Sequence, residues 1–338
     1  MAEHAVFEIP RYTFLSGTTL NVKLAYKTFG KLNKNRDNVV VIPTFYGGRH
    51  AETEYMVGRG RAIDPAQHFV VIPNMLGNGL STSPSNTPAP YGRGGFPLVS
   101  LYDNVRCQHQ LLTEELKVKK IRLVAGFSMG AMQAFQWGAM FPELVEAIAP
   151  ICGAARVSDH NYLFVDSAVA ALKLDPDFKD GWYDAPPLRG LLTFGKVYAA
   201  WLFSQDFMRG AHYRDLGLAA RHDVVLLTQN YFLQNDANDL IAMANTWMQG
   251  DISANPIFKG DFKRALKAIR CRAIVMPGTT DLYFRVADNE AEVKLMPNAV
   301  CRPIPSVWGH GAGFGLAPAD NAFIDRAVAE LLKPNRGS

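Results

Sequence analysis

The sequence predicts an α/β protein with a mostly parallel central sheet, helices on both faces and an inserted helical segment. Three observations indicate this class. Short apolar runs alternate with amphipathic stretches up to about residue 154, and the same rhythm resumes after about residue 265. Residues 155–265 lack a convincing buried strand. The 338 residues are too few for two full domains, so we expect the middle segment to be inserted into one domain.

The expected strands are short runs bounded by turn residues. Residues 39–42 (VVVI) and 69–72 (FVVI) are uninterrupted β-branched runs, which are typical of strands buried on both faces of a parallel sheet. The alternation with helices predicts βαβ units with right-handed crossovers. The other expected strands are 22–28, 121–126, 145–150, 271–276 and 299–304, and the expected helices of this body are 100–117, 129–141 and 319–332.

The inserted segment has a different composition. Its helical stretches are rich in Leu, Ala and aromatic residues and are broken at Pro176, Pro186–Pro187 and Pro256. We therefore divide the chain into a core domain, 1–154 with 266–338, and a lid, 155–265. The lid is expected to lie over the carboxyl edge of the sheet, with aromatic side chains that either line a site or pack the lid onto the body. The candidates are Tyr162, Trp182, Tyr198, Trp201 and Trp247.

Composition excludes several classes of function. Hydrophobic residues make up 48% and charged residues 20%, and the net charge of +4 is scattered without a basic face interleaved with aromatics, so we expect no nucleic acid partner. No run approaches eighteen apolar residues and the N-terminus does not resemble a secretory signal, so we expect a cytoplasmic protein without a membrane partner. The four cysteines form no C-x-x-C pair and are expected to be buried free thiols, with no metal or other cofactor.

The strongest motif is Gly126-Phe127-Ser128-Met129-Gly130, between an expected strand and an expected helix. This is the G-x-S-x-G pattern of a nucleophile elbow, a sharp strand-to-helix turn that exposes the serine hydroxyl at the carboxyl edge of the sheet. Residues two positions either side must be small, because larger side chains would collide with the turn. The pattern predicts Ser128 as a catalytic nucleophile.

A serine hydroxyl needs a base to take its proton. His310 is the outstanding candidate, because it follows the last expected strand in the glycine-flanked loop Trp308-Gly309-His310-Gly311. His50 is the alternative, although it precedes the serine and so fits the expected order of nucleophile, acid and histidine poorly.

The acid of such a triad should leave the strand before the histidine. Asp281 follows the expected strand ending at Met276 after a tight turn, and its role would be to orient the imidazole and stabilise the imidazolium. Asp288 and Glu290, further along in an expected helix, are alternatives.

The oxyanion hole is expected to use two backbone N–H groups. Met129 opens the helix after the serine, so its amide can face a developing oxyanion. Phe45 is the preferred second donor, in a loop whose glycines Gly47 and Gly48 allow close approach of the backbone. Tyr46 is the next choice for that donor, and a plain turn is the alternative for the loop.

Several stretches of the sequence resemble the homoserine O-acetyltransferase family of α/β-hydrolases, including its esterase-like members. The similar stretches are PTFYGGRHAE at 43–52, NMLGNGLSTSPSN at 74–86, GFSMGAMQAFQW at 126–137, DLYF at 281–284 and WGH at 308–310. The resemblance implies the α/β-hydrolase fold, a Ser128–Asp281–His310 triad, a helical lid, a homodimer formed through that lid and an acyl-serine intermediate.

Two departures from the homoserine-using members favour the esterase-like branch. Those members resemble one another in a G-G-S-M-G-G elbow and in an Asp after the catalytic histidine that contacts the amino-acid acceptor, whereas this chain has G-F-S-M-G-A and Gly311. A buried ammonium group without a carboxylate partner is costly. Tyr46 and Trp308, beside the expected catalytic residues, are the candidates for contact with the substrate.

We therefore expect a serine carboxylic-ester hydrolase that acts on short-chain acyl esters, with a small-molecule ester as partner. The alternative is an O-acyltransferase that moves an acetyl group from acetyl-CoA to a small, homoserine-like alcohol. A third hypothesis is a catalytically silent binding module, against which the intact set of Ser, Asp and His argues.

Overall fold

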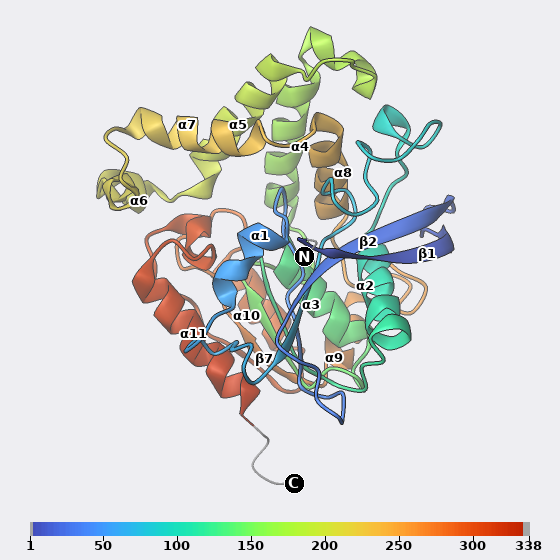
Figure 1. Ribbon diagram of the computed structural model, residues 1–338. Helices are drawn as coiled ribbons and strands as arrows, with labels where there is room; N and C mark the ends of the chain where they lie inside the picture. The colour runs from blue at the N-terminus through green and yellow to red at the C-terminus, as the bar shows by residue number, and fades with distance from the viewer. Residues whose placement is uncertain (1–2, 334–338) are drawn as a thin grey trace.

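A computed structural model describes residues 3–333 as a sheet-bearing body beneath a cap of helices (Figure 1). The described residues form one sheet of eight strands in the order β1-β2-β4-β3-β5-β6-β7-β8. Its first two neighbour pairs are antiparallel, and every pair from β4–β3 to β7–β8 is parallel. The strands are β1 (Ala5–Thr13), β2 (Thr19–Phe29), β3 (Val39–Val41), β4 (Phe69–Pro73), β5 (Ile121–Phe127), β6 (Ala147–Ile151), β7 (Arg272–Val275) and β8 (Ala299–Cys301).

The central strands are apolar at every position because both faces of the sheet are covered. In β3, Val39 and Val41 join one apolar cluster and Val40 joins another on the opposite face. Successive side chains of a strand point to opposite faces, so an unbroken Val run serves both cores. The expected mostly parallel sheet with helices on both faces is confirmed.

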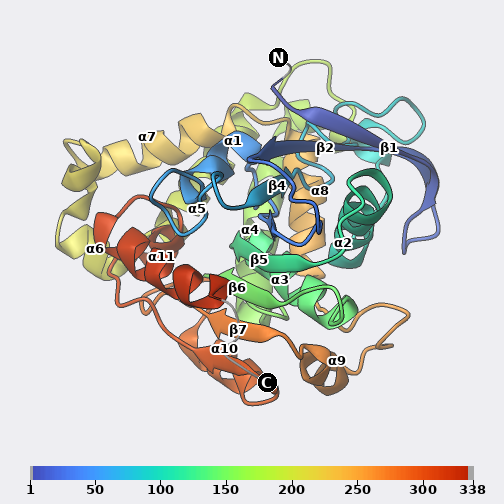
Figure 2. The same cartoon turned by 60° about the horizontal axis from the view of Figure 1, so that its bottom comes forward.

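Helices cover both faces of the sheet. On one face lie α2 (Leu101–Gln110), which continues as a π-helical turn at Leu111–Glu115, and α3 (Met129–Met140). On the other lies α11 (Pro318–Leu332), whose Ile324, Val328 and Leu331 are buried against the sheet. Figure 2 shows α2 and α11 on opposite sides of β5 and β6. A short helix, α1 (His50–Thr53), follows β3, and α10 (Val286–Val293) precedes β8.

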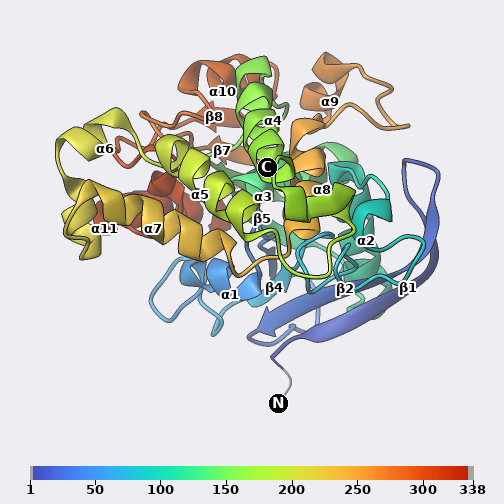
Figure 3. The same cartoon turned by 90° about the horizontal axis from the view of Figure 1, so that it is seen from above.

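The inserted segment forms the cap of helices above the body. Helices α5 and α7 contact each other along the cap, as the view from above in Figure 3 shows. The helices are α4 (Asp159–Lys173), α5 (Leu188–Leu202), α6 (Gln205–Arg209), α7 (Arg221–Phe232) and α8 (Ala237–Met248). Next in the chain, α9 (Phe262–Ala268) packs against α3 on the body, with Ala265 and Leu266 fully buried there. The division of the chain at residues 155 and 265 stays a prediction, but α9 shares the core of the sheet.

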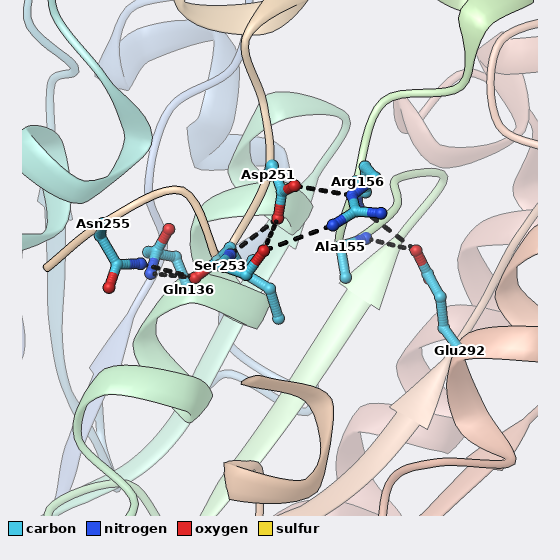
Figure 4. Close-up of polar contacts among 8 residues, drawn as sticks. Gln136, Ala155, Arg156, Asp251, Ser253, Asn255 and Glu292 are labelled. Carbon is cyan, nitrogen blue, oxygen red and sulfur yellow. Dashed lines mark hydrogen bonds and ion pairs between the residues drawn. The ribbon is translucent and has the colours of Figure 1, made fainter. Parts of the chain in front are cut away.

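The cap is joined to the body where its two ends meet. The backbone of Val157 donates to Gly250, and that of Ile252 donates to Ala155, so the outgoing and returning segments pair. Arg156 Nε lies 2.7 Å from Asp251 Oδ2, and Glu292 of α10 accepts from the amides of Ala155 and Arg156 at 2.8 and 3.3 Å (Figure 4).

Strands β1 and β8 show two ways in which the structure departs from the sequence-based expectation. Strand β1 was not predicted, because as an edge strand it leaves most side chains exposed and lacks a continuous apolar run. Strand β8 is shorter than the expected 299–304, because Pro303 has no N–H to offer a ladder, although Ile304 still donates to Pro277 at 2.8 Å. Within residues 3–333, no helix is long and apolar enough to cross a membrane.

Candidate active site

Ser128 lies at a sharp turn between β5 and α3, as the elbow motif predicts. Its backbone has φ 56° and ψ −122°, outside the ordinary regions for a residue with a side chain. A Cβ at Gly126 would lie 2.2 Å from the carbonyl oxygen of Gly130, so the turn closes only with glycine there. Such strain in a buried turn is typical of functional sites.

Three polar side chains meet at this turn from three separate loops. Ser128 Oγ lies 2.9 Å from His310 Nε2, and His310 Nδ1 lies 2.8 Å from Asp281 Oδ2. Because a carboxylate can only accept, Nδ1 carries the proton and Nε2 is left as the acceptor for the serine hydroxyl. The arrangement can therefore pass a proton from Ser128 to His310.

Asp281 and His310 are both held away from solvent. The side chain of Asp281 is fully buried, and its other oxygen, Oδ1, accepts from the amides of Tyr283 and Phe284 at 2.7 and 3.3 Å. The imidazole of His310 packs between two aromatic rings, with centroids 4.7 Å from Phe127 and 4.4 Å from Tyr283. These contacts fix the carboxylate and the ring before any substrate arrives.

The loop after β3 lies directly against the elbow. A Cβ at Gly130 would lie only 2.5 Å from the carbonyl oxygen of Pro43, so glycine permits this approach. Within residues 3–333, the amides of Phe45 and Met129 donate no intramolecular hydrogen bond. Among the described residues both N–H groups are therefore left without an acceptor, and their part in an oxyanion hole stays a prediction.

A cavity of about 240 Å³ opens onto Ser128 and His310. Its wall is formed by aromatic and aliphatic side chains from the body and from the cap, and no acidic side chain, lysine or arginine lines it among the described residues. The lining beyond Ser128 and His310 is Phe45, Tyr46, Phe127, Tyr198, Leu202, Phe203, Leu216, Leu218, Leu227, Thr228, Tyr231, Phe232, Phe314 and Leu316.

Of the two expected substrate contacts, one lines this cavity and one does not. Tyr46 is part of the wall, and its hydroxyl donates to the carbonyl of Leu240 at 3.1 Å. Trp308 is not in the wall: its ring packs on Phe207 of the cap with centroids 5.0 Å apart. Trp308, two residues before His310, is therefore a packing residue, because side chains that are close in a tight loop can point in different directions.

The other residues proposed from the sequence also divide into those that line the cavity and those that do not. Among the five aromatic residues proposed for the lid, Tyr198 lines the cavity, whereas Trp182 is 48% exposed and Trp247 is fully buried. His50 lies away from the wall, where its Nδ1 is 3.2 Å from Asn74 Nδ2. Asp288 and Glu290 lie in α10, outside the cavity wall.

Five further residues of the wall were not predicted from the sequence. Leu216, Leu218 and Leu227 come from the cap, and Phe314 and Leu316 come from the loop after His310. For Phe314 and Leu316 the sequence offered one indication, because both closely follow the WGH motif that contains His310. For the leucines the sequence carried no signal, because apolar residues of a helical insertion serve packing and lining alike.

All four cysteines are free, as expected, but Cys301 is only partly buried. Cys107, Cys152 and Cys271 are buried, and burial raises the pKa of Cys152 well above its ordinary value. Within residues 3–333, no group of three or more His, Cys, Asp or Glu side chains is placed to hold a metal ion.

The fold and this elbow define the class of the protein. The chain belongs to the α/β-hydrolase fold family, whose sequence profile matches residues 37–306.

Known relatives place it more closely within that family. It is 36% identical over 313 residues to an ethyl acetate hydrolase of Pseudomonas veronii, covering 91% of this chain and 89% of that protein. The structure of an acetylester hydrolase from Corynebacterium glutamicum matches with a TM-score of 0.95 at 32% identity, covering 98% of this chain and 96% of that chain. A homoserine O-acetyltransferase of Trichormus variabilis is 28% identical over 315 residues, covering 88% and 85%. The resemblance to homoserine O-acetyltransferases and to their esterase-like relatives is confirmed.

Proposed function

We propose that this protein is a serine carboxylic-ester hydrolase that acts on short-chain acyl esters through an acyl-serine intermediate. The observation that carries the proposal is the chain of hydrogen bonds from Ser128 through His310 to Asp281. Ser128 and His310 line a cavity in which the described residues place no acidic side chain, lysine or arginine. The similarity to an ethyl acetate hydrolase and to an acetylester hydrolase supports the same substrate class.

In the first half of the reaction, Ser128 Oγ attacks the ester carbonyl while His310 Nε2 takes the hydroxyl proton. The amides of Phe45 and Met129 stabilise the oxyanion that forms on the carbonyl oxygen. The C–O bond to the alcohol then breaks, and His310 gives the same proton to the departing alkoxide. The products are a free alcohol and an acyl-Ser128.

In the second half, His310 takes a proton from water as the water oxygen attacks the acyl carbonyl. The bond to Ser128 breaks, the proton returns to Ser128 Oγ, and the carboxylic acid leaves. Asp281 holds the proton-bearing Nδ1 and stabilises the imidazolium in both halves. The proposed roles need no metal or other cofactor, because every group that moves a proton belongs to the chain.

The alternative acceptor is a homoserine-like alcohol, with acetyl-CoA as acyl donor. The similarity to a homoserine O-acetyltransferase supports this reaction as the alternative. The absence of a carboxylate argues for water, because no acidic side chain lines the cavity among the described residues and the position after His310 is Gly311. An ammonium group desolvated there without a partner costs about 1–3 kcal/mol or more, or roughly tenfold to a hundredfold in preference.

A paired assay tests the choice between the two acceptors. One arm measures the acid released from p-nitrophenyl acetate and from a butyl ester, and the other measures free thiol released from acetyl-CoA with homoserine. We expect ester hydrolysis to exceed homoserine-dependent thiol release by at least about tenfold. Faster thiol release would replace the hydrolase by the acyltransferase.

We further propose that the enzyme acts in the cytoplasm as a homodimer, with no nucleic acid or membrane partner. The outer surface of the cap supports the dimer, because Leu163 of α4 and Leu188 of α5 are 60% and 56% exposed. Light scattering that gives the mass of a single chain at micromolar concentration would remove this part of the proposal.

A further inference from the structure

The loops that carry Asp281 and His310 leave neighbouring strands, and their backbones stay paired for only a short distance. Thr279 donates its amide to the carbonyl of Ile304 at 3.0 Å, just beyond the parallel strands β7 and β8. Among the described residues, no further backbone–backbone hydrogen bond joins the two loops beyond that point. Contacts between their side chains and backbones must then decide how far apart the carboxylate and the imidazole stand.

The hydroxyl of Thr280 spans the two loops. Its Oγ1 donates to the carbonyl of Ser306 at 2.9 Å and accepts from the amide of Gly309 at 3.1 Å. Thr280 directly precedes Asp281, and Gly309 directly precedes His310. A single hydroxyl therefore joins the two backbone positions that stand immediately before the acid and the base.

The neighbouring Thr279 makes a similar pair of bonds that do not reach the histidine. Its Oγ1 donates to the carbonyl of Ser306 at 3.0 Å and accepts from the amide of Ser306 at 3.2 Å. Both bonds end on one residue near the start of the loop. The two threonines thus offer the same chemistry, but only Thr280 contacts the residue next to His310.

The backbone of the histidine loop is packed closely against the cap at Gly309, so its position relative to the Asp281 loop is sensitive to small shifts. This glycine has φ +60°, and a Cβ there would lie 2.6 Å from the amide nitrogen of Ser204 in the cap. On the other side, Asp281 Oδ1 accepts from amides of its own loop, those of Tyr283 and Phe284, and these two bonds do not set its distance from the histidine loop. The distance from Asp281 to His310 therefore depends on what joins the loops.

From this geometry we propose that Thr280 is a positioning residue that sets the contact between Asp281 and His310. It touches neither the substrate nor the reacting atoms and acts through the backbone of Gly309. The inference rests on the proposed function, in which that contact holds the imidazole in the correct tautomer and orientation. A catalytic group displaced by about 1 Å can lose on the order of a hundredfold in rate, so a loosened tether should be visible in kcat.

The test replaces Thr280 by Val, which exchanges the hydroxyl for a methyl group of similar shape. We expect kcat for p-nitrophenyl acetate to fall by about tenfold to a hundredfold with KM nearly unchanged. Thr280→Ser, which keeps the hydroxyl, should restore most of the rate. Thr279→Val is the matched control, because it removes two bonds to Ser306 without touching Gly309, and its kcat should stay near wild type.

A second readout does not depend on turnover. The proton on His310 Nδ1 that bonds to Asp281 should give a downfield proton NMR signal, which Thr280→Val should shift or broaden and Thr279→Val should leave in place. If the wild type hydrolyses no ester but this pattern appears, the proposed function fails and the positioning role stands. An unchanged signal and kcat in Thr280→Val, or equal losses in both valine variants, would overturn the inference. Thr280→Ala replaces the valine variant if thermal unfolding shows that the latter does not fold.

Discussion

Gly130→Ala probes the contact between the elbow and the loop that carries Phe45. The added methyl group would lie 2.5 Å from the carbonyl oxygen of Pro43 and 3.5 Å from that of Thr44. The first contact is impossible as it stands, and a backbone carbonyl cannot swing aside as a long side chain could. The loop must therefore move away from the elbow.

The size of this movement follows from the contact itself. To widen it from 2.5 Å to the ordinary 3.4 Å, Pro43 must move by about 0.9 Å, and Phe45 lies two residues further along the same loop. An oxyanion donor works at about 2.7–3.1 Å, and losing one such donor costs about a hundredfold to a thousandfold in kcat. We expect a loss at the lower end of that range, because the amide of Phe45 would be displaced and not removed.

Steady-state kinetics with p-nitrophenyl acetate measure the effect, and thermal unfolding checks the fold. Gly138→Ala is the matched control, since it makes the same change in the same helix, where the nearest atoms are side-chain methyl groups of Ile269 and Ile148. We expect the control to keep its kcat. If Gly130→Ala is folded and keeps more than half of the wild-type kcat, the loop at Phe45 does not supply the oxyanion donor.

Two further predictions concern the proton relay and the pH dependence of stability. Ser128→Ala and His310→Ala should each lower kcat/KM for a chromogenic ester by about 10⁴-fold or more, and the double variant should be little worse, because the pair acts as a unit. His50→Ala should lower kcat/KM only mildly. An equal loss in His50→Ala would contradict the assignment of His310 as the base. Burial raises the pKa of Glu292 from 4.5 to about 7, so between these values the folded protein holds a proton that the unfolded chain releases. The free energy of unfolding should therefore fall by on the order of 3 kcal/mol as pH rises through that window. Calorimetry should show a shallower fall for Glu292→Gln. An identical slope in the two proteins would show that Glu292 is not the cause of the pH dependence.

Much of the site could be read from the sequence because its constraints are local. The elbow at Ser128 requires small residues at fixed spacing, since the turn places backbone atoms where their side chains would be. Asp281 and His310 follow the last two parallel strands, and the carboxyl ends of parallel strands meet at one edge. Motif spacing and strand order together were therefore enough to predict three residues that the structure brings into hydrogen-bond contact.

The fold was predictable wherever the burial of an element left a clear pattern of apolar residues in its own sequence. Strand β3 is apolar throughout because both its faces are buried, and such a run has no other stable position. Strand β1 was missed because its exposed edge leaves no such pattern. The sequence also does not indicate where α9 packs, because a short helix with few apolar residues does not determine which surface covers it.

The amino-acid sequence by itself determined the kind of sheet and predicted the elbow and the three residues, Ser128, Asp281 and His310, that the structure brings into hydrogen-bond contact. Only the tertiary structure decided what surrounds them: that Tyr198 lines the cavity while Trp247 is packed away, that Trp308 turns from the site, and that Thr280 reaches Gly309. The physical reason is that a motif constrains the backbone within a few residues. A cavity wall or a bond between loops depends on the directions of side chains brought together from distant parts of the chain, and the same residue types serve equally well in the core.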